Sequence, residues 1–362
     1  MNLDLDPTQT LLRDTVREYL AAELPFDRVR SCEREQRWDP ELWQGIVQQG
    51  WLGLPFSEEL GGGGGGLVDA GLLVEEFARR AAVVPINEVL AVALTIVRFA
   101  PRERARAIVA GLLAGELVPV PAVLETGDDL ADVRAPVSGG ALAAEKLFVD
   151  YGQFATHHLV AAREQGELGL FWVAVEDQRV RAQPLQTIGR TPSARVVYRD
   201  APAEPIAAAQ AVSALISTAR ILAAVQCLGA AQQALDMTVA YAKVREQFNR
   251  PIGSFQAVQH HAANMASRVA STRFLVYEAL HALGRGSASA RQIAFAKASA
   301  SRMVPEVTML AHQIHGGNGM IEENDLYFFT LRGKERSLAW GSAEECLAEA
   351  AASVEAPQEW LC

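Results

Sequence analysis

The sequence of 362 residues is poor in the residues that mark metal-binding and disulfide-rich proteins. It has only four cysteines, none in a CxxC or CxH spacing: Cys32, Cys227, Cys346 and Cys362. A disulfide framework needs a denser set of cysteines in a small secreted chain. Two histidine pairs are present, at 157–158 and 260–261, but adjacent helical side chains point apart and do not chelate together. We therefore expect no metal site and no disulfide scaffold.

Positive charge is also scarce. The chain has 33 Lys and Arg against 43 Asp and Glu, a net charge of -10, which argues against nucleic acid as a partner. The first residues have neither the basic nor the apolar region of a signal peptide, and charges interrupt the long apolar runs. We expect a cytoplasmic protein that does not cross a membrane. A GxSxG nucleophile motif is absent as well.

Half of the residues are hydrophobic, so the chain has enough apolar side chains for a large core. Hydrophobic periodicity predicts an α+β protein in three parts: an N-terminal helical domain at 1–114, a middle β-barrel at 115–207 and a C-terminal four-helix bundle at 208–362. Short β-type runs, punctuated by Gly, Pro and Asp, indicate a small antiparallel barrel or sandwich; they lie at 117–123, 147–149, 158–161, 170–175 and 195–198. Long alanine-rich helices are expected at 208–243, 255–284 and 288–316.

A run of six glycines, Gly61 to Gly66, could be mistaken for a phosphate-binding loop. It lacks the GK[ST] sequence that would bring a lysine to phosphate, and it follows no clear strand. We interpret it as a flexible surface loop.

Two segments of the C-terminal part have the chemistry of a dinucleotide site. The first runs from Arg245 through Gln247, Phe248, Phe255 and Gln256 to His260, and the second is the sequence QIHGGNG from Gln313 to Gly319. A pyrophosphate needs a planar cationic donor and a backbone that can approach closely, which an arginine and the glycines Gly316 and Gly317 supply. Taken alone, each segment would be an ordinary surface charge or turn.

Together these segments resemble the FAD-binding residues of the acyl-CoA dehydrogenase family. The resemblance covers nearly the whole chain and is strongest in the C-terminal third. It implies FAD as cofactor, and contacts across a subunit interface to the adenosine-diphosphate half of a flavin held by the neighbouring chain. The implied contact residues are Arg245, Gln247, Phe248, Phe255, Gln256, Gln313, Gly316 and Gly317. Asn249 departs from the usual glycine.

The catalytic glutamate of that family is missing. The family carries it before a Gly-Thr or Gly-Ser near the C-terminus, or before an arginine 25 residues ahead of the arginine of the first segment. Here Trp340 precedes Gly341-Ser342, and Ala219 precedes Arg220. Neither an indole nor a methyl group can take the α proton of a thioester. The resemblance assigns Arg220 to substrate binding and leaves no catalytic residue.

The stretches that line the flavin ring in the family are also altered. A Thr-Glu-Pro…Gly-Ser-Asp stretch is replaced by Leu-Glu-Thr-Gly-Asp-Asp at 124–129. A Trp-Ile-Thr stretch is replaced within Lys-Leu-Phe-Val-Asp-Tyr-Gly at 146–152. A domain that has lost the proline, the tryptophan and the threonine is not expected to hold a flavin ring of its own.

The combined hypothesis is a subunit of a heteromeric acyl-CoA dehydrogenase, inactive alone. It resembles the non-catalytic chain of the α2β2 assemblies of actinobacterial sterol side-chain degradation. The implied partners are a sister dehydrogenase subunit, an acyl-CoA substrate and an electron-transfer flavoprotein or similar acceptor. Two alternatives stay open: an active homotetramer with a displaced base such as Glu344, and a non-enzymatic acyl-CoA-binding scaffold. Glu345, Glu322 and Glu323 are further acids near the glycines or Trp340, each expected to be solvated.

Overall fold

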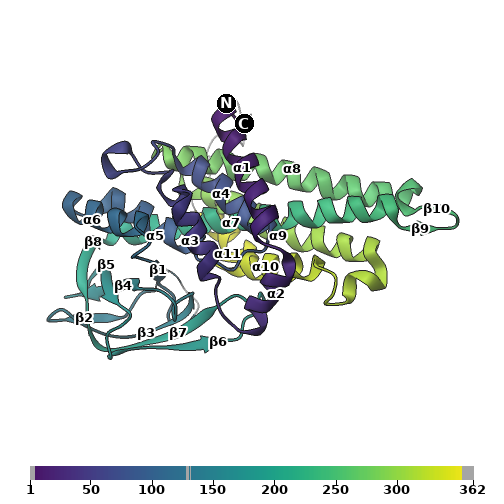
Figure 1. The fold of residues 1–362 in the computed structure, drawn as a ribbon. Coiled ribbons are helices and arrows are strands. Elements are labelled where there is room, and N and C mark those ends of the chain that lie inside the picture. The colour runs from purple at the N-terminus through teal and green to yellow at the C-terminus, as the bar shows by residue number, and fades with distance from the viewer. Residues whose placement is uncertain (1–4, 128–129, 131, 353–362) are drawn as a thin grey trace, which may run out of the picture.

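A computed structural model describes residues 5–127, 130 and 132–352 of the chain. Helices come first along the chain, then strands, then helices again (Figure 1). This order confirms the predicted three-part α+β fold. The predicted domain limits stay predictions; the change from helix to strand falls between Leu113 and Pro119, and the change back falls between Ala208 and Ala209.

The N-terminal part is helical. Its helices are α1 (Pro7–Glu23), α2 (Phe26–Arg34), α3 (Pro40–Gln48), α4 (Leu67–Arg79), α5 (Ile86–Phe99) and α6 (Arg102–Leu113), with 3-10 turns at Trp51–Gly53 and Glu58–Leu60. The sequence signals their starts. The carboxylate of Asp6 accepts the amide of Gln9 at 2.8 Å, and that of Asp39 accepts the amide of Leu42 at 3.0 Å. A proline follows each of these acids, where its missing N–H costs nothing.

The glycine run before α4 lies at the surface but is bonded throughout to its own neighbourhood. The amides of Gly62 to Gly66 donate to carbonyls of residues 53, 54, 56 and 57 and to the Asp69 carboxylate. A Cβ on Gly62 would lie 2.3 Å from the carbonyl oxygen of Phe56, which explains a glycine there. Because these donors are already used, the loop offers none to a phosphate.

The middle part is one eight-stranded sheet. Its strands are β1 (Pro119–Ala122), β2 (Pro136–Ser138), β3 (Ala141–Asp150), β4 (His157–Glu164), β5 (Glu167–Ala174), β6 (Val180–Leu185), β7 (Ser193–Pro202) and β8 (Glu204–Ala208). The order is β6-β7-β3-β2-β4-β5-β8, with β1 beside β4. The sheet is mixed and not wholly antiparallel as expected, because β1 and β2 both run parallel to β4.

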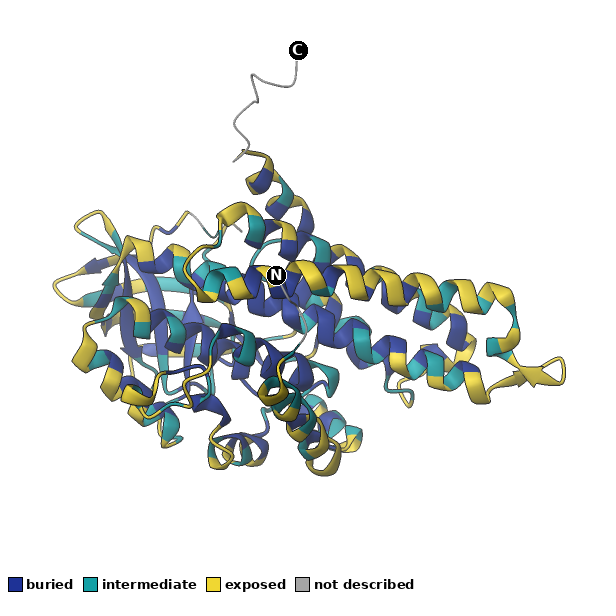
Figure 2. Cartoon of the chain, turned by 90° about the horizontal axis from the view of Figure 1, so that it is seen from above, coloured by how far each residue is buried: buried dark blue, intermediate teal, exposed yellow. Residues whose placement is uncertain are grey.

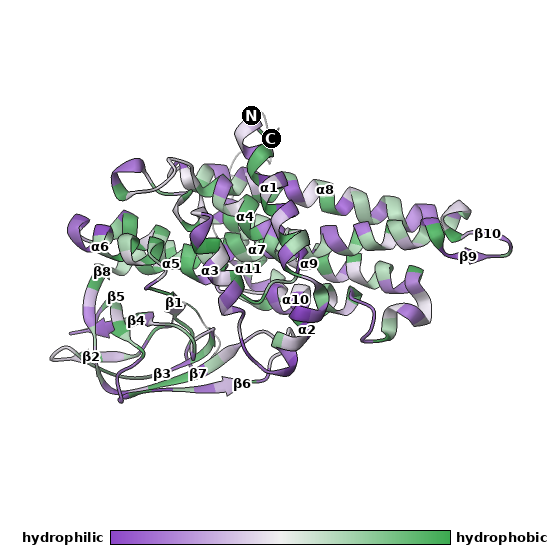
Figure 3. Cartoon of the chain, in the orientation of Figure 1, coloured by the Kyte–Doolittle hydropathy of each residue, from purple (hydrophilic) through white to green (hydrophobic). Residues whose placement is uncertain are grey.

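The C-terminal part is a bundle of α7 (Ala209–Val244), α8 (Gln256–Gly284), α9 (Ala290–His315), α10 (Leu326–Leu338) and α11 (Ala343–Ala352). A short hairpin, β9 (Glu246–Gln247) and β10 (Arg250–Pro251), and a 3-10 turn at Ile252–Ser254 join α7 to α8; a second turn, Gly316–Met320, follows α9. Hydrophobic residues concentrate along α5 and α7, whereas the hairpin is hydrophilic (Figure 3). Buried residues gather where the three parts meet, and the far end of the bundle is largely exposed (Figure 2).

Helix α7 is the one described helix long and apolar enough to span a membrane, with a mean hydropathy of 1.7 over its most apolar window. In the structure 72% of that window is buried inside the protein. Its apolar composition therefore serves the core of the bundle.

Candidate functional site

The first predicted binding segment is the end of α7, the hairpin and the start of α8. Arg245 directly follows α7, and β9 and β10 pair antiparallel across a turn made by Phe248 and Asn249. Both turn residues have positive φ, 54° and 61°, as in a type I′ hairpin turn. Asn adopts this left-handed region more readily than most residues, so Asn249 is compatible with the turn.

The side chains of this segment face solvent. Phe248 is 86% exposed, and its ring lies edge-on to that of Phe255 with centroids 6.0 Å apart. The guanidinium of Arg250 lies 4.0 Å from the centre of the Phe255 ring. Three polar side chains have no hydrogen-bond partner among the residues that the structure describes: Arg245, Gln247 and Gln256. They are free to contact another molecule.

The second predicted segment ends α9 and begins the turn after it. Gln313, Gly316 and Gly317 are all exposed. Gly316 has a φ of 60°, which strains other residues, whereas Gly317 has no such requirement. A Cβ on either glycine would meet no atom within 4 Å. Nothing in the described chain therefore explains Gly317, and its bare backbone is open to close approach from outside.

The two segments meet at one end of the bundle (Figure 1). The ring of Tyr241, whose carbonyl accepts the amide of Arg245 at 2.9 Å, stacks on the ring of His315. Their centroids are 4.4 Å apart and their planes differ by 15°. Because His315 directly precedes Gly316, this stack joins the arginine segment to the glycine segment. The eight predicted contact residues thus lie at the same end, exposed or half-buried.

These residues fit the adenosine-diphosphate half of FAD by their chemistry. A free guanidinium supplies a planar fork for pyrophosphate, and bare glycine backbone permits close approach. Exposed amides and aromatic rings suit ribose and adenine. Seven of the eight predicted contact residues are exposed and Phe255 is half-buried, so a ligand bound to them would be shielded from solvent only by a second surface.

The two positions of the missing base lie together. Trp340 is half-buried in the loop between α10 and α11, with a φ of 60°, and Ala219 is fully buried in α7. The Nε of Arg220, the neighbour of Ala219, donates to the carbonyl of Trp340 at 2.8 Å. One hydrogen bond thus connects the segment that contains Ala219 to the loop that contains Trp340, and neither position carries a carboxylate.

Arg220, predicted to bind substrate, is fully engaged within the chain. Besides the Trp340 carbonyl, its two terminal nitrogens donate to the two carboxylate oxygens of Glu349 at 2.5 and 2.9 Å. Burial opposes the charge, but the Glu349 hydrogen bond raises the pKa of Arg220. The substrate role stays a prediction, and a substrate would have to displace Glu349. No sequence pattern singles out that residue, which lies 129 positions away.

The four candidate acids are all exposed. Glu344 opens α11, and the carboxylate of Glu345 accepts the amide of Ser342 at 2.7 Å as a helix cap. Glu322 pairs with Arg190 at 2.7 Å, and Glu323 faces solvent. Glu344 and Trp340 do not share a helical face, because a non-helical loop separates α10 from α11. A base for a thioester must be desolvated, which exposure does not provide.

Hydrogen bonds join the two stretches related to flavin-ring binding, residues 124–129 and 146–152. Lys146 is fully buried, and its ammonium donates to Glu125 at 2.6 Å and to the carbonyl of Val123 at 3.0 Å. The amide of Leu147 donates to the carbonyl of Leu124 at 2.9 Å. Burial lowers the pKa of Lys146, and the Glu125 carboxylate partly offsets this. Asp128 and Asp129 lie outside the described residues.

A second buried cluster closes the space between the sheet and the helices. The guanidinium of Arg336 on α10 donates to Asp150 at the end of β3 at 2.6 Å and to Glu335 at 2.7 Å. It lies 3.6 Å from Glu88 of α5. Glu335 also accepts the amide of Gly189 at 2.7 Å. One cation thus links the three parts of the fold.

A small cavity of about 50 Å³ remains beside this cluster. Its lining includes Glu88, Tyr151, Arg332 and Arg336. Ligand pockets usually hold about 300–1,000 Å³. The cavity has space for a few waters and is too small for a flavin ring or an acyl chain.

The paired histidines serve packing. His158 is buried, with its ring nitrogens near the carbonyl of Gly152 at 2.9 Å and the hydroxyl of Tyr198 at 2.7 Å. The ring of His157 stacks on Trp172 at 4.7 Å. Within the described ranges there is no group of three or more His, Cys, Asp or Glu side chains placed to hold a metal. Cys32, Cys227 and Cys346 are buried free thiols, and Cys362 falls outside the described ranges.

Comparison with known families matches both helical parts. The family model described as acyl-CoA dehydrogenase, N-terminal domain, matches residues 6–116, and the one described as acyl-CoA dehydrogenase, C-terminal domain, matches residues 209–345. The acyl-CoA dehydrogenase IpdE2 of Mycolicibacterium smegmatis is 29% identical over 353 residues, covering 95% of this chain and 98% of that protein. IpdE2 of Mycobacterium tuberculosis is 30% identical over 337 residues, covering 92% and 91%.

Two solved structures also have the same fold as this chain. The ChsE4-ChsE5 complex from Mycobacterium tuberculosis contains a chain that superimposes with a TM-score of 0.92 and is 25% identical, covering 98% of this chain and 100% of that one. A variant of the Tcur3481-Tcur3483 steroid ACAD gives a TM-score of 0.90 at 29% identity, covering 95% and 97%.

Proposed function

Because the chain belongs to the acyl-CoA dehydrogenase family, we propose that it is the non-catalytic subunit of a heteromeric, FAD-dependent member. A sister chain would supply the glutamate base and the site of the flavin ring. This chain would close over the adenosine-diphosphate half of that flavin. The observation that carries the proposal is that both base positions, Trp340 and Ala219, lack a carboxylate while the FAD-binding surface is free.

The filled crevice between sheet and helices supports this division of labour. Lys146 pairs with Glu125, and Arg336 pairs with Asp150, so three residues of the stretches related to flavin-ring binding are held in ion pairs within the chain. Moving these pairs aside would leave buried charges without partners, which costs several kcal/mol for each broken pair. We infer that this chain holds no flavin ring of its own.

Exposed apolar side chains at the end of the bundle support a partner there. Val244 is 76% exposed, Met309 65% and Met320 75%, and Phe248 lies nearby in the hairpin. Single exposed apolar residues are ordinary, but a group around free polar binding residues is typical of an interaction site. A sister chain covering this end would bury these side chains and provide the second surface that a dinucleotide needs.

Two solved relatives support a proposal for the assembly and the substrate class. The ChsE4-ChsE5 complex pairs two chains, and the Tcur3481-Tcur3483 protein is named a steroid ACAD. By this likeness we propose an α2β2 heterotetramer that acts on the CoA thioester of a steroid-derived acyl group. An electron-transfer flavoprotein or a similar protein would accept the electrons, and the location would be cytoplasmic.

The chemical contribution of this chain would be binding and shielding. When bound, FAD supplies the acceptor for the hydride that leaves the β carbon of the acyl group. Arg245 would hold the pyrophosphate, and Gly316 and Gly317 would let the backbone approach it. Covering the adenosine half would fix the position of the flavin in the sister chain. The α proton would go to the sister chain's glutamate.

Two other functions fit less well. An active homotetramer would need Glu344 as a base, but Glu344 is exposed and lies beyond the loop that carries Trp340. A scaffold without enzymatic activity does not explain why Arg245, Gln247 and Gln256 are all free on the surface that the family uses for FAD.

Expression with and without a sister chain tests the proposal. The chain should be colourless alone and should co-purify as a yellow, active complex with a sister dehydrogenase that carries the glutamate. Flavin bleached by an acyl-CoA in the single-chain preparation would favour the homotetramer. A colourless preparation in both cases would favour the scaffold.

A further inference from the structure

A separate cavity lies between α1, α4, α7 and α8. Its volume is about 450 Å³, within the usual range of about 300–1,000 Å³ for small-molecule sites. It lies apart from the FAD-binding surface: none of the eight predicted FAD contacts lines it. Its lining is Leu5, Arg13, Arg17, Leu72, Glu75, Glu76, Arg79, Gln232, Asp236, Arg273, Phe274 and Tyr277.

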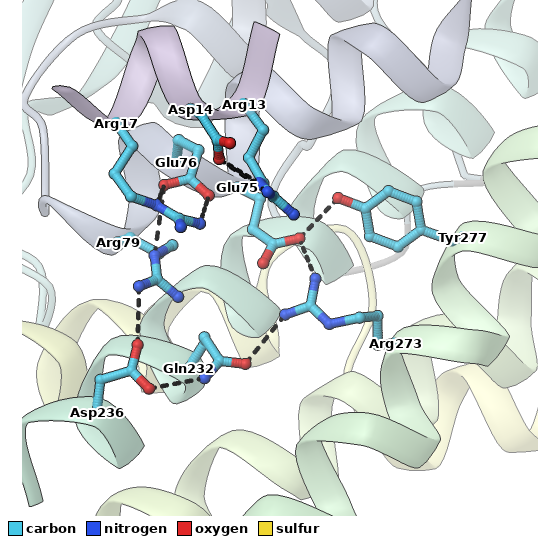
Figure 4. A network of polar contacts seen from close by, with 10 residues as sticks. All are labelled: Arg13, Asp14, Arg17, Glu75, Glu76, Arg79, Gln232, Asp236, Arg273 and Tyr277. Carbon is cyan, nitrogen blue, oxygen red and sulfur yellow. Dashed lines mark hydrogen bonds and ion pairs between the residues drawn. The ribbon is translucent and has the colours of Figure 1, made fainter. Parts of the chain in front are cut away.

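The polar walls are built from one continuous network (Figure 4). Arg17 of α1 forms two hydrogen bonds to Glu76 at 2.6 and 3.0 Å. On the other side, Arg273 of α8 and the hydroxyl of Tyr277 both donate to the same oxygen of Glu75 at 2.6 Å. The carboxylates of Glu75 and Glu76 are at most 5% exposed, so the network is an ordered wall and not a set of loose surface pairs.

The network continues across the floor between α4 and α7. Arg79 donates to Asp236 at 2.8 Å, and Gln232 binds both Asp236 at 2.9 Å and Arg273 at 3.2 Å. These contacts hold the donors of three helices in fixed positions. A ligand that used those donors would therefore meet a preorganised site.

The lining carries excess positive charge although the chain as a whole carries -10. Four arginines and three carboxylates line the cavity, and the acid that pairs with Arg13, Asp14, is not among the lining residues. Of the four arginines, Arg13 has the most weakly held ion pair within the chain. Its Nε and Nη2 both contact a single oxygen of Asp14 at 2.8 Å, and Asp14 is 47% exposed. Exposed ion pairs of this kind contribute at most about 1 kcal/mol, so Arg13 can turn to another anion at little cost.

Unused donors point to the same ligand chemistry. Among the described residues, no acceptor contacts the Nη1 of Arg13, the Nη1 of Arg17 or the Nε of Arg273. The remaining lining is apolar: Leu72 is buried, and Phe274 is 57% exposed. A site lined by both guanidinium donors and apolar side chains suits an anion with an apolar body.

We propose that this cavity binds a small amphipathic anion, whose carboxylate or phosphate takes the free N–H groups of Arg13 and Arg273 and whose apolar part packs on Leu72 and Phe274. Octanoate and octyl phosphate are suitable probes for the two anionic groups. Octan-1-ol is the neutral control of the same chain length.

The test is calorimetric titration of the full chain. Octanoate or octyl phosphate should bind at one site, with the tighter of the two identifying the preferred anionic group, and octanol should bind weakly or not at all. Arg13→Gln should weaken binding about ten- to hundredfold, the range expected for one charged hydrogen-bonding group. Phe274→Ser should also weaken it. Arg302→Gln, which removes an exposed arginine of α9 outside the cavity, should leave binding unchanged.

These variants are chosen to fold. Arg13 pairs only with an exposed carboxylate, and Phe274 is itself exposed, whereas loss of Arg273 would strand the buried Glu75. The proposal fails if neither anion binds at millimolar concentration, if octanol binds as well, or if Arg13→Gln binds like the unmodified chain. It also fails if the chain alone binds the anion but the complex with the sister subunit does not, because the cavity would then be part of a protein interface. Its failure leaves the flavin-sharing proposal untouched, since flavin content is measured separately.

Discussion

Arg336 is the centre of a buried ion-pair cluster between the sheet and the helices. It is buried with three carboxylates around one guanidinium: Glu88, Asp150 and Glu335. Such a cluster cannot hold every acid ionised at low cost. Burial accordingly raises the pKa of Glu88 to about 7, and burial also raises the pKa of Asp150. Both Glu88 oxygens are without a hydrogen-bond partner, which fits a group that is partly protonated.

Replacing Glu88 by Gln should stabilise the protein at alkaline pH. Folding raises the pKa of Glu88 from about 4.3 in the unfolded chain to about 7 in the folded one. The contribution of Glu88 to the free energy of unfolding is therefore fully present below about pH 4.3 and is lost as the pH rises to about 7. The loss is roughly 1.4 kcal/mol per pH unit over this window. The melting temperature of Glu88→Gln should therefore exceed that of the unmodified chain at pH 8 and approach it at pH 4. Glu103→Gln, on the surface of α6, is the control with no expected change. Equal differences at both pH values would mean that Glu88 is already ionised in the folded protein.

Glu344→Gln should leave turnover of the complex unchanged, because Glu344 is exposed and the proposed base belongs to the sister chain. Loss of a general base costs at least about a hundredfold in rate. Steady-state turnover of the assembled complex measures this directly, and removal of the sister chain's glutamate is the positive control. If Glu344→Gln lost activity on that scale while the complex stayed yellow, the displaced base would be real.

The lack of a carboxylate at the two family positions can be read from the sequence alone, since it depends only on Trp340 and Ala219; that the chain has no catalytic base stays a prediction. The filled crevice could not be predicted in this way. Asp150 and Arg336 lie 186 positions apart, and neither lies in a pattern that predicts an ion pair. The contact of Lys146 with Glu125 depends on how β3 and the loop after β1 are placed in space.

At the scale of elements, the helices were predicted more successfully than the strands. The long alanine-rich helices begin and end within two residues of their expected limits. Three strands of the large sheet are not predicted, β2, β6 and β8, and each contains a proline: Pro136, Pro184 and Pro205. Proline removes a ladder hydrogen bond and so weakens the strand signal of a segment, although β1 is predicted despite its two prolines. In the structure β6 and β8 are the two ends of the sheet, where a missing donor is tolerated.

The loop between α10 and α11 is held by two buried cations. Arg220 binds the carbonyl of Trp340, and the ammonium of Lys297 donates to the carbonyls of Ser337 at 3.0 Å and Gly341 at 2.8 Å. Its third bond goes to the hydroxyl of Ser301 at 2.7 Å. Each of the three N–H donors of the Lys297 ammonium thus has an acceptor. These bonds stabilise the charged form, whereas burial lowers the pKa of Lys297.

Lys297→Met should loosen this loop. The substitution keeps the length of the side chain but leaves buried carbonyls without a donor, at a cost of about 1–3 kcal/mol for each group left unsatisfied. We expect a lower melting temperature and faster amide exchange at residues 338–343. Lys334→Met, an exposed position of α10, is the matched control. Unchanged exchange in the loop would show that Arg220 alone holds it.

At the scale of the molecule, ion pairs from α10 connect the C-terminal helices to the N-terminal helices and to the sheet. Arg332 binds Glu33 of α2 at 2.9 Å, and Arg336 binds Asp150 of the sheet. The far end of the bundle is different, because the hairpin and the turn after α9 project beyond this body (Figure 1). The projecting hairpin and the turn after α9 are therefore suited to contact a partner.

The flavin content of the complex should reflect this asymmetry. If the crevice of this chain stays filled while its open end serves the sister chain, the complex should carry one FAD for each pair of unlike chains. The ratio of flavin absorbance to protein concentration measures this number. One FAD on every chain would contradict the filled crevice.

Arg245→Ala should lower the flavin content of that complex without breaking it apart. The guanidinium has no partner among the described residues, so its removal strands no buried charge and should not affect folding. One charged hydrogen-bonding contact contributes roughly 1.5–3 kcal/mol, which corresponds to about ten- to hundredfold in affinity. Flavin should therefore be lost on dilution or gel filtration, while the complex keeps its size. Arg285→Ala, an exposed arginine at the other end of α8, should retain its flavin. Full flavin retention by Arg245→Ala would make Arg245 an ordinary surface charge and would remove the central residue of the proposed FAD-binding surface.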